Sequence, residues 1–546
     1  MKITIQQKLR DIIAKYSKDK IFDILIPPNV DWGDYSTNLA FRIIGNPMVN
    51  AENLKSIFAV DEELKILCGE ISVVGSGFVN FKLSANVLND NLGIIIKSGD
   101  KYGDLEIGKD PSIGSGQEIN LEFVSANPTG PPTVGNARAA SYGDTLGNIL
   151  RKAGYQVIKE YYLNDIGVQV NKLGLSVAKR YLQLQDKDVE FEEDLYQGEY
   201  IKDIAKEFES EIKSKKLGDM ELLADFCRDR AVEMMTEKAK QIMNKMGVEF
   251  DVWFKESELY KSGEVAEALE RLKKEDVVEE KDGATWFKYG EDKEAVLIKS
   301  DGNKTYLMGD IAYSLNKLEK RGFDKAINIW GTDHHGDVPR LLGAIKILGH
   351  EGKLEIILHQ LVTLKSKDEK LKISKRAGNL VLLEDLIKDV GKDATRFFFL
   401  SKDLNTHMEF DIDLAKEQSK KNPVFYIQYA FARLNSIFVK LKIETEKLKF
   451  EVESLKLLKE KEEIQLMRTM AKFPDVLENI VHSRQVHHLA TYAHELAGQF
   501  HQFYEKHRVV QDNLELQNAR TVLAQGVYIV LKNCLNLMGL STPFKM

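Results

Sequence analysis

Two short segments of this chain contain the residue types that chemistry on a nucleotide needs. The first, SANPTGPPTVGN, follows an apolar stretch and precedes a segment with helical spacing. Its prolines stiffen the backbone, its glycines let a flat base approach, and its threonine and asparagine supply neutral donors near the helix start. The candidate nucleotide-binding residues are Pro128, Gly130, Thr133, Gly135 and Asn136. Taken alone, the segment is equally typical of a glycine–proline turn that caps a helix.

The second segment, KLKISKRAGN, is a basic stretch interrupted by small residues, and its candidate functional residues are Lys372, Ser374 and Lys375. Cations beside flexible residues suit a loop that closes on a triphosphate, where negative charge develops on the leaving pyrophosphate. Taken alone, such a stretch is more often a solvated basic loop.

A strand and a helix must hold the first segment, and the sequence supplies both. We expect strands over 119–125 and 155–165, joined by a helix that ends at Gly154. This β-α-β unit predicts a parallel sheet with a right-handed crossover. Further strands are expected over 325–336 and 354–365, with a helix over 338–349 between them.

The pattern divides the chain into three parts. Residues 1–100 indicate a small α/β module, in which ISVVGSGFVNFKLS is typical of strand–turn–strand, and the linker KDPSIGSGQ follows. An α/β Rossmann-like catalytic domain is expected over 115–404, with a charged, mostly helical insertion over about 170–290. Helical spacing over 405–546 predicts an all-α bundle of four or five helices, with helices at 422–442, 461–481 and 486–507.

Composition excludes several classes of protein. No apolar run approaches the roughly 18–20 residues that span a bilayer, and the N-terminus resembles an amphipathic helix rather than a secretory signal, so a cytoplasmic protein is expected. The cysteines Cys68, Cys227 and Cys534 are far apart and show no metal-ligand spacing, so no metal site is expected. A net charge of −7 argues against a whole-surface polyanion binder but not against local RNA patches.

Together the two segments resemble the signature motifs of class I aminoacyl-tRNA synthetases. The usual His-x-Gly-His appears as Thr-Val-Gly-Asn at 133–136, and Lys-Met-Ser-Lys-Ser appears as Lys-Ile-Ser-Lys-Arg at 372–376. The surrounding segments resemble the arginyl-tRNA synthetase family specifically: WGDYSTNLAF, LEFVSANPTGPPTVGNARAA, EYYLNDIGVQV, SDGNKTYLMGDIAYSLNK, WGTDHHGDVPRL, KRAGNLVLLEDLI, EFDIDLAKEQSKKNPVFYIQYAFARL and STPFKM. They occur in the family's order and reach Met546, so the resemblance covers the whole chain.

The chain departs from the family at the first motif, where both histidines are absent. A Thr hydroxyl and an Asn amide can still donate hydrogen bonds to phosphate, and the related tryptophanyl enzymes carry the same variant. Lys375 is present where many arginyl enzymes lack a lysine. Because both histidines are missing, an alternative function of a different class stays open: a homologue without catalytic activity that only binds RNA or a partner. A second rival is a synthetase for another amino acid, such as the zinc-holding cysteinyl enzyme.

The resemblance implies an arginine site made of Glu122, Asn127, Tyr306, Asp310 and His334. A guanidinium is planar and always charged, so carboxylates are its best partners. We therefore expect Asp310 and Tyr306 at the guanidinium, with Asn127 and His334 at the α-amino and carboxylate ends and Glu122 at either. The alternatives are a strand-end carboxylate that caps a loop, for Glu122, and ordinary turn residues, for the histidines.

The resemblance also implies the partners. ATP is expected as a substrate, accompanied by Mg²⁺ that phosphates and water hold, without zinc. The other partners are L-arginine and tRNA(Arg), which receives the amino acid at its 3′ end with release of AMP and diphosphate. No membrane contact is expected, and the protein is expected to be a monomer.

Two regions are expected to contact tRNA. In the helical bundle, Tyr426, Tyr429 and Arg433 fall three and four residues apart on one helical face, where bases can stack; their alternative is bundle core. The N-terminal module resembles the family domain at the tRNA elbow, with Tyr35 and Asn38 as candidate contacts. Trp32 and Phe78 match the same pattern, and Phe78 is expected in the core.

The substitution Lys375→Ala is expected to lower the rate of adenylate formation with only a modest effect on ATP affinity. A cation at this motif acts on charge that develops in the transition state rather than in the bound substrate. Pre-steady-state adenylation and ATP titration measure the two quantities. A variant that reacts at the parental rate would show that Lys375 does not compensate for the absent histidines.

Overall fold

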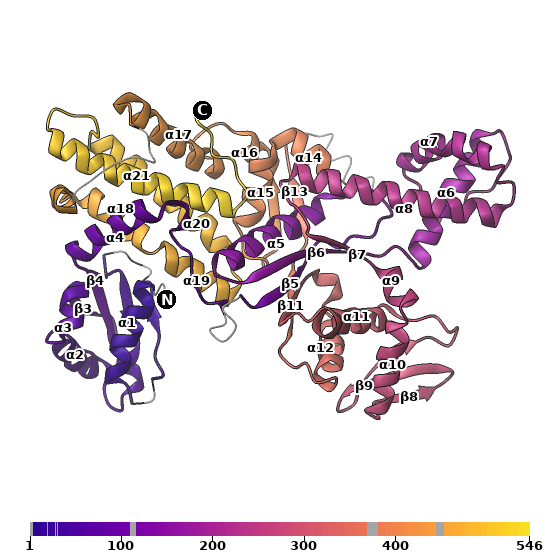
Figure 1. Cartoon of the computed structure of the whole chain (residues 1–546), viewed down its shortest axis with the longest axis horizontal. Helices are drawn as coiled ribbons and strands as arrows, with labels where there is room; N and C mark the ends of the chain where they lie inside the picture. The colour runs from indigo at the N-terminus through magenta and orange to yellow at the C-terminus, as the bar shows by residue number, and fades with distance from the viewer. Residues whose placement is uncertain are drawn as a thin grey trace. The chain divides into compact units, whose positions relative to one another are not determined.

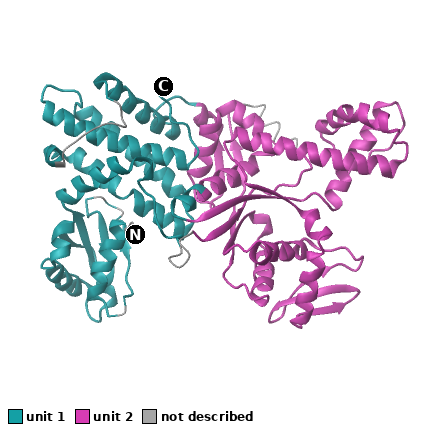
Figure 2. Cartoon of the chain, viewed as in Figure 1, with its two compact units in different colours: residues 1–109, 148–154, 417–546 teal, residues 110–147, 155–416 magenta. Residues whose placement is uncertain are grey.

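A computed structural model describes residues 4–18, 20–27, 29, 31–109, 116–367, 381–443 and 452–546. The chain forms two compact units, one made of residues 1–109, 148–154 and 417–546 and the other of residues 110–147 and 155–416 (Figure 2). Most of the predicted linker 109–117 lies outside the described residues. Within the described part of the chain, no helix has the length and apolarity needed to cross a membrane.

The second unit is built on a parallel sheet of five strands, in the order β12-β11-β5-β6-β7. The strands are β5 (Glu118–Glu122), β6 (Gln156–Leu163), β7 (Val252–Lys255), β11 (Lys325–Gly331) and β12 (Leu354–His359). The helix α5 (Val134–Lys152) connects β5 to β6. The predicted β-α-β unit and parallel sheet are therefore confirmed.

The strand predicted over 354–365 is wrong in its extent, because it is two strands in two sheets. After β12 the chain leaves the parallel sheet, and β13 (Val362–Lys365) pairs with β14 (Met408–Asp411). At the junction the Gln360 N–H donates to the carbonyl of Leu404 at 3.0 Å. An uninterrupted apolar pattern does not reveal such a change of pairing partner.

Alternation along β6 sends two neighbouring charged side chains to opposite faces of the sheet. On one face, Lys159 donates to Asp144 of α5 at 2.6 Å, and Arg396 also pairs with Asp144. On the other face, Glu160 pairs with Arg321, at the end of the helical segment formed by α11 (Tyr306–Leu315) and a π-helical turn (Asn316–Lys320). Both faces of the sheet thus bury carboxylates together with cations.

The range predicted as an insertion contains more than helices. The helices α6 (Val168–Leu184), α7 (Glu199–Lys215) and α8 (Met220–Lys245) pack around their own apolar core and extend away from the sheet (Figure 1). The chain then returns to the sheet as β7. It continues through α9 (Glu256–Lys261), α10 (Glu264–Lys274) and an antiparallel sheet of β8 (Val278–Lys281), β9 (Ala284–Gly290) and β10 (Lys293–Ile298).

The remaining helices of this unit flank the sheet and the β13–β14 pair. They are α12 (Val338–Ile347), α14 (Leu383–Val390), α15 (Lys392–Leu400) and α16 (Ile412–Lys416). A second apolar core lies between α11, α12, β9 and the sheet, and Met308, Ile311 and Phe287 are fully buried there.

The first unit combines the two ends of the chain. At the N-terminus, β1 (Ile24–Leu25), β2 (Tyr35–Thr37), β4 (Phe78–Leu83) and β3 (Cys68–Val74) form an antiparallel sheet in that order, which confirms the predicted α/β module. Its helices are α1 (Ile5–Ile13), α2 (Pro47–Phe58), α3 (Glu62–Leu67) and α4 (Ala85–Ser98).

The C-terminal part of the first unit is the predicted all-α bundle. Its helices are α17 (Pro423–Leu441), α18 (Lys461–Ala471), α19 (Phe473–Ser483), α20 (His487–Lys506) and α21 (Leu514–Leu537). The single helix predicted over 461–481 is broken at Lys472. Pro474 has no N–H and fits only the first turn of a helix, so a new helix begins there.

Substituting Gly143→Ala is expected to destabilise the second unit. Gly143 lies in α5, and an added methyl group would enter the ring of Phe123, which is fully buried beside β5. Overpacking of this kind costs about 1–3 kcal/mol of unfolding free energy. Gly218→Ala, in an exposed loop with open space around the glycine, is the matched control and should leave thermal unfolding nearly unchanged.

Candidate active site

Polar side chains gather where the parallel strands end, the edge of such a sheet at which ligands bind. Glu122 is the last residue of β5, and Asn164 directly follows β6. Glu256 directly follows β7, and His334 lies in the short 3-10 turn (Thr332–His334) after β11. Four strands thus contribute to one edge.

Helix α11 adds Tyr306 and Asp310, which lie four residues apart on one helical face. The Tyr306 side chain is 66% exposed. Among the described residues, no ion pair or hydrogen bond engages the Asp310 carboxylate. Burial, and then the charges of Glu122 and Glu256, raise the pKa of Asp310 well above its usual value. A carboxylate in this condition is expected to take up a cation.

Sequence reasoning missed Glu256, a buried carboxylate that faces the same space. Its Oε2 accepts a hydrogen bond from Asn164 Nδ2 at 2.9 Å, and no cation of the described chain pairs with it. Burial, and then Asp165, raise the pKa of Glu256. The available signal was the apolar run VWF at 252–254, which belongs to β7 and is separated from Glu256 only by Lys255, inside a stretch whose high charge predicts helix and solvent.

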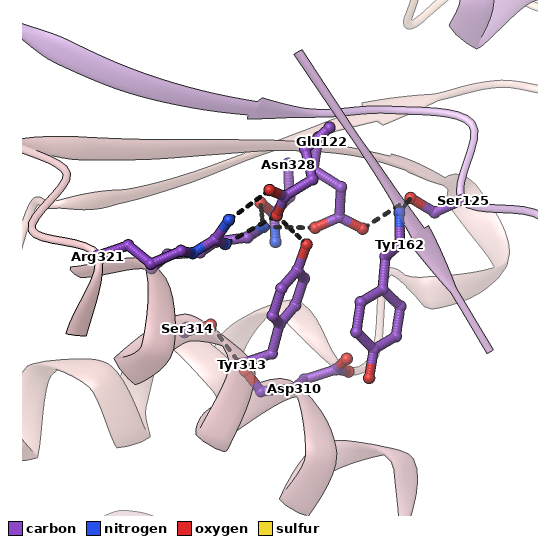
Figure 3. Close-up of polar contacts among 10 residues, drawn as sticks. Glu122, Ser125, Tyr162, Asp310, Tyr313, Ser314, Arg321 and Asn328 are labelled. Atoms are coloured by element: carbon purple, nitrogen blue, oxygen red, sulfur yellow. Dashed lines mark hydrogen bonds and ion pairs between the residues drawn. The ribbon is translucent and has the colours of Figure 1, made fainter. Parts of the chain in front are cut away.

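Glu122 is held by two side chains, one of which is itself held by the backbone of β6. Ser125 Oγ donates to its Oε1 at 2.9 Å, and Lys317 Nζ donates to its Oε2 at 2.6 Å (Figure 3). Ser125 Oγ also accepts a hydrogen bond from the Tyr162 N–H at 3.1 Å. The backbone between them is strained, with φ of 72° at Val124 and 39° at Ser125, which side chains rarely adopt. Such strain is common where a loop is held for binding.

The other two residues predicted at the arginine site are exposed. Asn127 Nδ2 donates to Gln169 Oε1 at 2.7 Å. His334 lies 3.7 Å from carboxylate oxygens of Asp333 and Asp337, and its ring is 5.7 Å from that of Trp330. Their roles at a bound amino acid stay predictions. Across the described residues, no group of three or more His, Cys, Asp or Glu side chains could hold a metal ion.

The first motif forms a closed turn at the start of α5. The N–H and hydroxyl of Thr133 donate to Asn136 Oδ1 at 2.8 and 3.2 Å, and the Asn136 N–H donates to the Thr133 carbonyl at 3.0 Å. The Thr133 hydroxyl is thus occupied. The Asn136 side-chain N–H groups have no partner within the described chain, so they are the donors available to a ligand.

Helix α7 supports the loop that precedes this turn. Tyr200 of α7 donates its hydroxyl to the Thr129 carbonyl at 2.7 Å, next to Gly130. Pro128 is buried, while Gly135 is exposed on the first turn of α5. The exposed backbone at Gly135 leaves room for a flat base to approach.

The second motif, with Lys372, Ser374 and Lys375, lies outside the described residues. The chain that follows it is bound to the first motif by its backbone. The Val134 N–H donates to the Val381 carbonyl at 3.1 Å, and the Leu383 N–H donates to the Pro132 carbonyl at 3.0 Å. The first motif is therefore joined to the chain that directly follows the undescribed residues, at Val381 to Leu383.

A buried arginine that sequence reasoning missed fixes the same region. The Arg138 guanidinium, in α5, donates to the carbonyls of Gln360, Asp403 and Thr406 at 2.7–2.9 Å. Arg138 thereby holds the start of α5 against the junction between β12 and β13.

The candidate RNA face of the bundle, in the first unit, is half-buried rather than core. Arg433 lies 4.7 Å from the ring of Tyr429 and 4.9 Å from that of Tyr504. The rings of Tyr426 and His501 are 4.5 Å apart. Partly exposed aromatic rings beside an arginine are suitable for stacking with unpaired bases. Exposed Tyr504 extends the set that the sequence spacing indicated, whereas His501 is buried behind Tyr426.

The structure corrects the assignment of Tyr35. Its ring is fully buried, and its hydroxyl donates to Asp475 of α19, so Tyr35 packs the N-terminal module against the bundle and is not available to RNA. Burial raises the pKa of Asp475 to about 7. Asn38 is half-buried and exchanges hydrogen bonds with Asp23, so its RNA contact stays a prediction. Phe78 is also half-buried, against Phe41, rather than in the core.

Comparison with known protein families identifies the class of protein to which this site belongs. The profile of the class I tRNA synthetase (R) catalytic domain matches residues 106–414. The arginyl tRNA synthetase N-terminal domain matches residues 1–83, and the DALR anticodon binding domain matches residues 427–546. The parallel sheet and the site at its edge therefore define a class I tRNA synthetase.

Relatives that match the chain over its full length identify the family within this class. The chain is 40% identical to arginine–tRNA ligase 2 of Bacillus thuringiensis subsp. konkukian, covering 100% of this chain and 96% of that protein. It is 41% identical to the arginine–tRNA ligase of Desulforamulus reducens, over 96% and 93% of the two chains. The arginyl-tRNA synthetase structure of Thermus thermophilus has the same fold, with a TM-score of 0.77 at 19% identity over 99% of this chain and 100% of that one. The chain belongs to the arginyl-tRNA synthetase family.

Substituting Asp310→Asn is expected to raise thermal stability, and to raise it more as pH increases. A carboxyl whose pKa is higher in the folded than in the unfolded state opposes folding once pH exceeds the unfolded value, and this opposition grows until the folded pKa is reached. The amide removes that effect. Melting temperatures across mildly acidic to mildly alkaline pH measure it, with exposed Asp188→Asn as control; equal gains at every pH would contradict the raised pKa.

Proposed function

We propose that this chain joins L-arginine to tRNA(Arg), using ATP. The arginine carboxylate attacks the α-phosphorus of ATP, pyrophosphate leaves, and arginyl-adenylate forms. A ribose hydroxyl of the terminal tRNA adenosine then attacks the acyl carbon, and AMP leaves. No protein nucleophile is needed, so positioning and charge stabilisation account for the catalysis.

One observation supports arginine as the amino acid: Asp310 and Glu256 are two carboxylates without a cationic partner within the described chain, at the edge where four strands end. Each has a raised pKa. A guanidinium supplies a delocalised positive charge and several N–H donors, which two carboxylates accept well. Tyr306, one turn before Asp310 and largely exposed, is proposed to cover the guanidinium from the open side.

The other end of the amino acid needs different partners. Glu122 at the end of β5 is proposed to accept from the α-ammonium group. Asn127 and His334 are proposed to contact the α-amino and carboxylate ends, as family membership implies. Both side chains are exposed at the edge, so a bound amino acid would have to draw them in.

ATP is proposed to bind at the first motif. Its phosphates would lie near the N-terminus of α5, where backbone N–H groups and the Asn136 amide donate. Lys372, Ser374 and Lys375 are proposed to act on the leaving pyrophosphate. Magnesium would accompany ATP and be held mainly by its phosphates and water, as is usual for Mg²⁺ with nucleotides.

For tRNA, the aromatic and arginine face of α17 and α20 is proposed to stack anticodon bases, with Tyr426, Tyr429 and Arg433 as contacts. Asn38 of the N-terminal module is proposed as a contact at the elbow. A monomeric state and a cytoplasmic location stay predictions.

A retired homologue that only binds RNA is the remaining candidate of another class, motivated by the absent motif histidines. The carboxylate pair argues against it, since two uncompensated buried charges destabilise a fold that no longer uses them. Amino-acid-dependent exchange of pyrophosphate into ATP, with tRNA present, separates the two. Arginine should support exchange and charging; exchange with no amino acid, or with another one, would overturn the proposal.

The variants Asp310→Asn and Glu256→Gln are each expected to weaken the use of arginine and to leave the KM for ATP nearly unchanged. Losing one charged hydrogen-bond partner costs about 1.5–3 kcal/mol, which is roughly one to two decades in kcat/KM for arginine. Glu258→Gln, on the exposed side of α9, is the matched control. An unchanged arginine KM in either site variant would remove that residue from the site.

A further inference from the structure

Lys317 is a fully buried lysine that contacts Glu122 of the proposed arginine site. Its side chain has no exposed area, and its ammonium donates to Glu122 Oε2 at 2.6 Å and to Asn328 Oδ1 of β11 at 2.9 Å. The third side of the ammonium faces the ring of Tyr313, with Nζ 4.0 Å from the ring centroid. Every donor of this lysine is therefore used, and none is left for a substrate.

The position of Lys317 comes from an irregularity in its helix. After Leu315 the helix widens into the π-helical turn Asn316–Lys320, closed by the Arg321 N–H on the Asn316 carbonyl at 2.9 Å. Lys317 within this turn and Arg321 at its end both face the sheet, where they pair with Glu122 and Glu160; the Arg321 side chain is labelled in Figure 3. Single π-helical turns are frequent at functional sites, where they redirect side chains.

The charges around the pocket fall into two groups. Those that act on Asp310 are Glu122 of β5, Glu256 of α9, Asp337 before α12 and Lys317. Deeper in the sheet, Glu160 faces Arg321, Lys317 and the Tyr313 hydroxyl, while Tyr162 and Tyr260 stay neutral because burial raises their pKa. Glu122 and Glu160 each have a cation, whereas Asp310 and Glu256 have none.

We propose that Lys317 is a positioning residue of the arginine site: it orients and neutralises Glu122, so that Asp310 ionises more readily when the guanidinium binds. This inference rests on the proposed function for its substrate. Without Lys317, Glu122 would add an uncompensated charge beside Asp310. Like charges in one site favour protonation of one of them, so the pocket would hold a proton that arginine must displace.

The experiment compares Lys317→Met with the parental chain in arginine-dependent pyrophosphate exchange with tRNA, from mildly acidic to mildly alkaline pH. The curve of arginine KM against pH should shift towards higher pH by roughly one to three pH units, because one nearby charge changes the pKa of a carboxylate by about that amount. The ratio of variant to parental KM is therefore largest at acidic pH and falls towards one as pH rises. The KM for ATP should not change.

The control is Lys159→Met, which removes an equally buried lysine paired with Asp144 on the opposite face of the sheet. Arg396 continues to pair with Asp144 in that variant, and its KM profile should match the parental one. A ratio for Lys317→Met that is the same at every pH, or a profile that stays in place, would overturn the proposal, because a purely structural loss carries no pH dependence.

A second measurement needs no substrate. The melting temperature of Lys317→Met should fall further below the parental value as pH rises, since an unpaired buried Glu122 opposes folding more strongly when ionised. If the parental chain does not use arginine but this deficit widens with pH, the proposed function fails while the neutralising role of Lys317 stands. A deficit independent of pH would refute that role.

Should Lys317→Met fail to fold, the double variant Glu122→Gln with Lys317→Met removes both members of the ion pair and creates no new unpaired charge. Its arginine KM is expected to rise through the loss of Glu122, but its profile should keep the parental position on the pH axis. An upward shift of that profile would overturn the proposal.

Discussion

The buried carboxylates of β5 and β6 require cations, and this requirement fixes the helical segment that carries the site. Breaking a buried ion pair by losing one partner costs about 3–5 kcal/mol. Lys317 and Arg321 meet Glu122 and Glu160, and they lie four residues apart on one face of the segment. A shift or rotation of the segment by one residue would leave a buried charge without its partner. The two ion pairs therefore also fix the direction in which Asp310 points.

This arrangement separates charges that hold the fold from charges that serve a ligand. On the α5 face, Asp144 is shared by two cations and needs nothing further. On the α11 face, two carboxylates are compensated and two are not. The two carboxylates without a cation destabilise the unliganded fold, and binding a cation removes that cost. The affinity for the cation and the lower stability of the unliganded fold therefore have the same cause.

Much of the fold and part of the site could be predicted from the sequence, because they depend on local patterns of residues. The alternation in β3 and β4 and the strand–loop–helix spacing around Thr133 are local and were predicted correctly. Glu256 could not be found in this way, since β7 is short and joins the sheet only by pairing with β6, far earlier in the chain. Tyr35 illustrates the other limit: a residue type that suits RNA is equally suited to a core, and only packing against Asp475 decides.

The junction between the first motif and the chain from Val381 to Leu383 has a consequence for how the sequence can vary in evolution. The contacts of Val134 with Val381 and of Leu383 with Pro132 use main-chain atoms alone. Side chains at Val381 and Leu382, which are only half-buried, are therefore free to drift without loosening the junction. A proline is tolerated at Pro132, where only a carbonyl is used, and is forbidden at Val134 and Leu383, where an N–H is required.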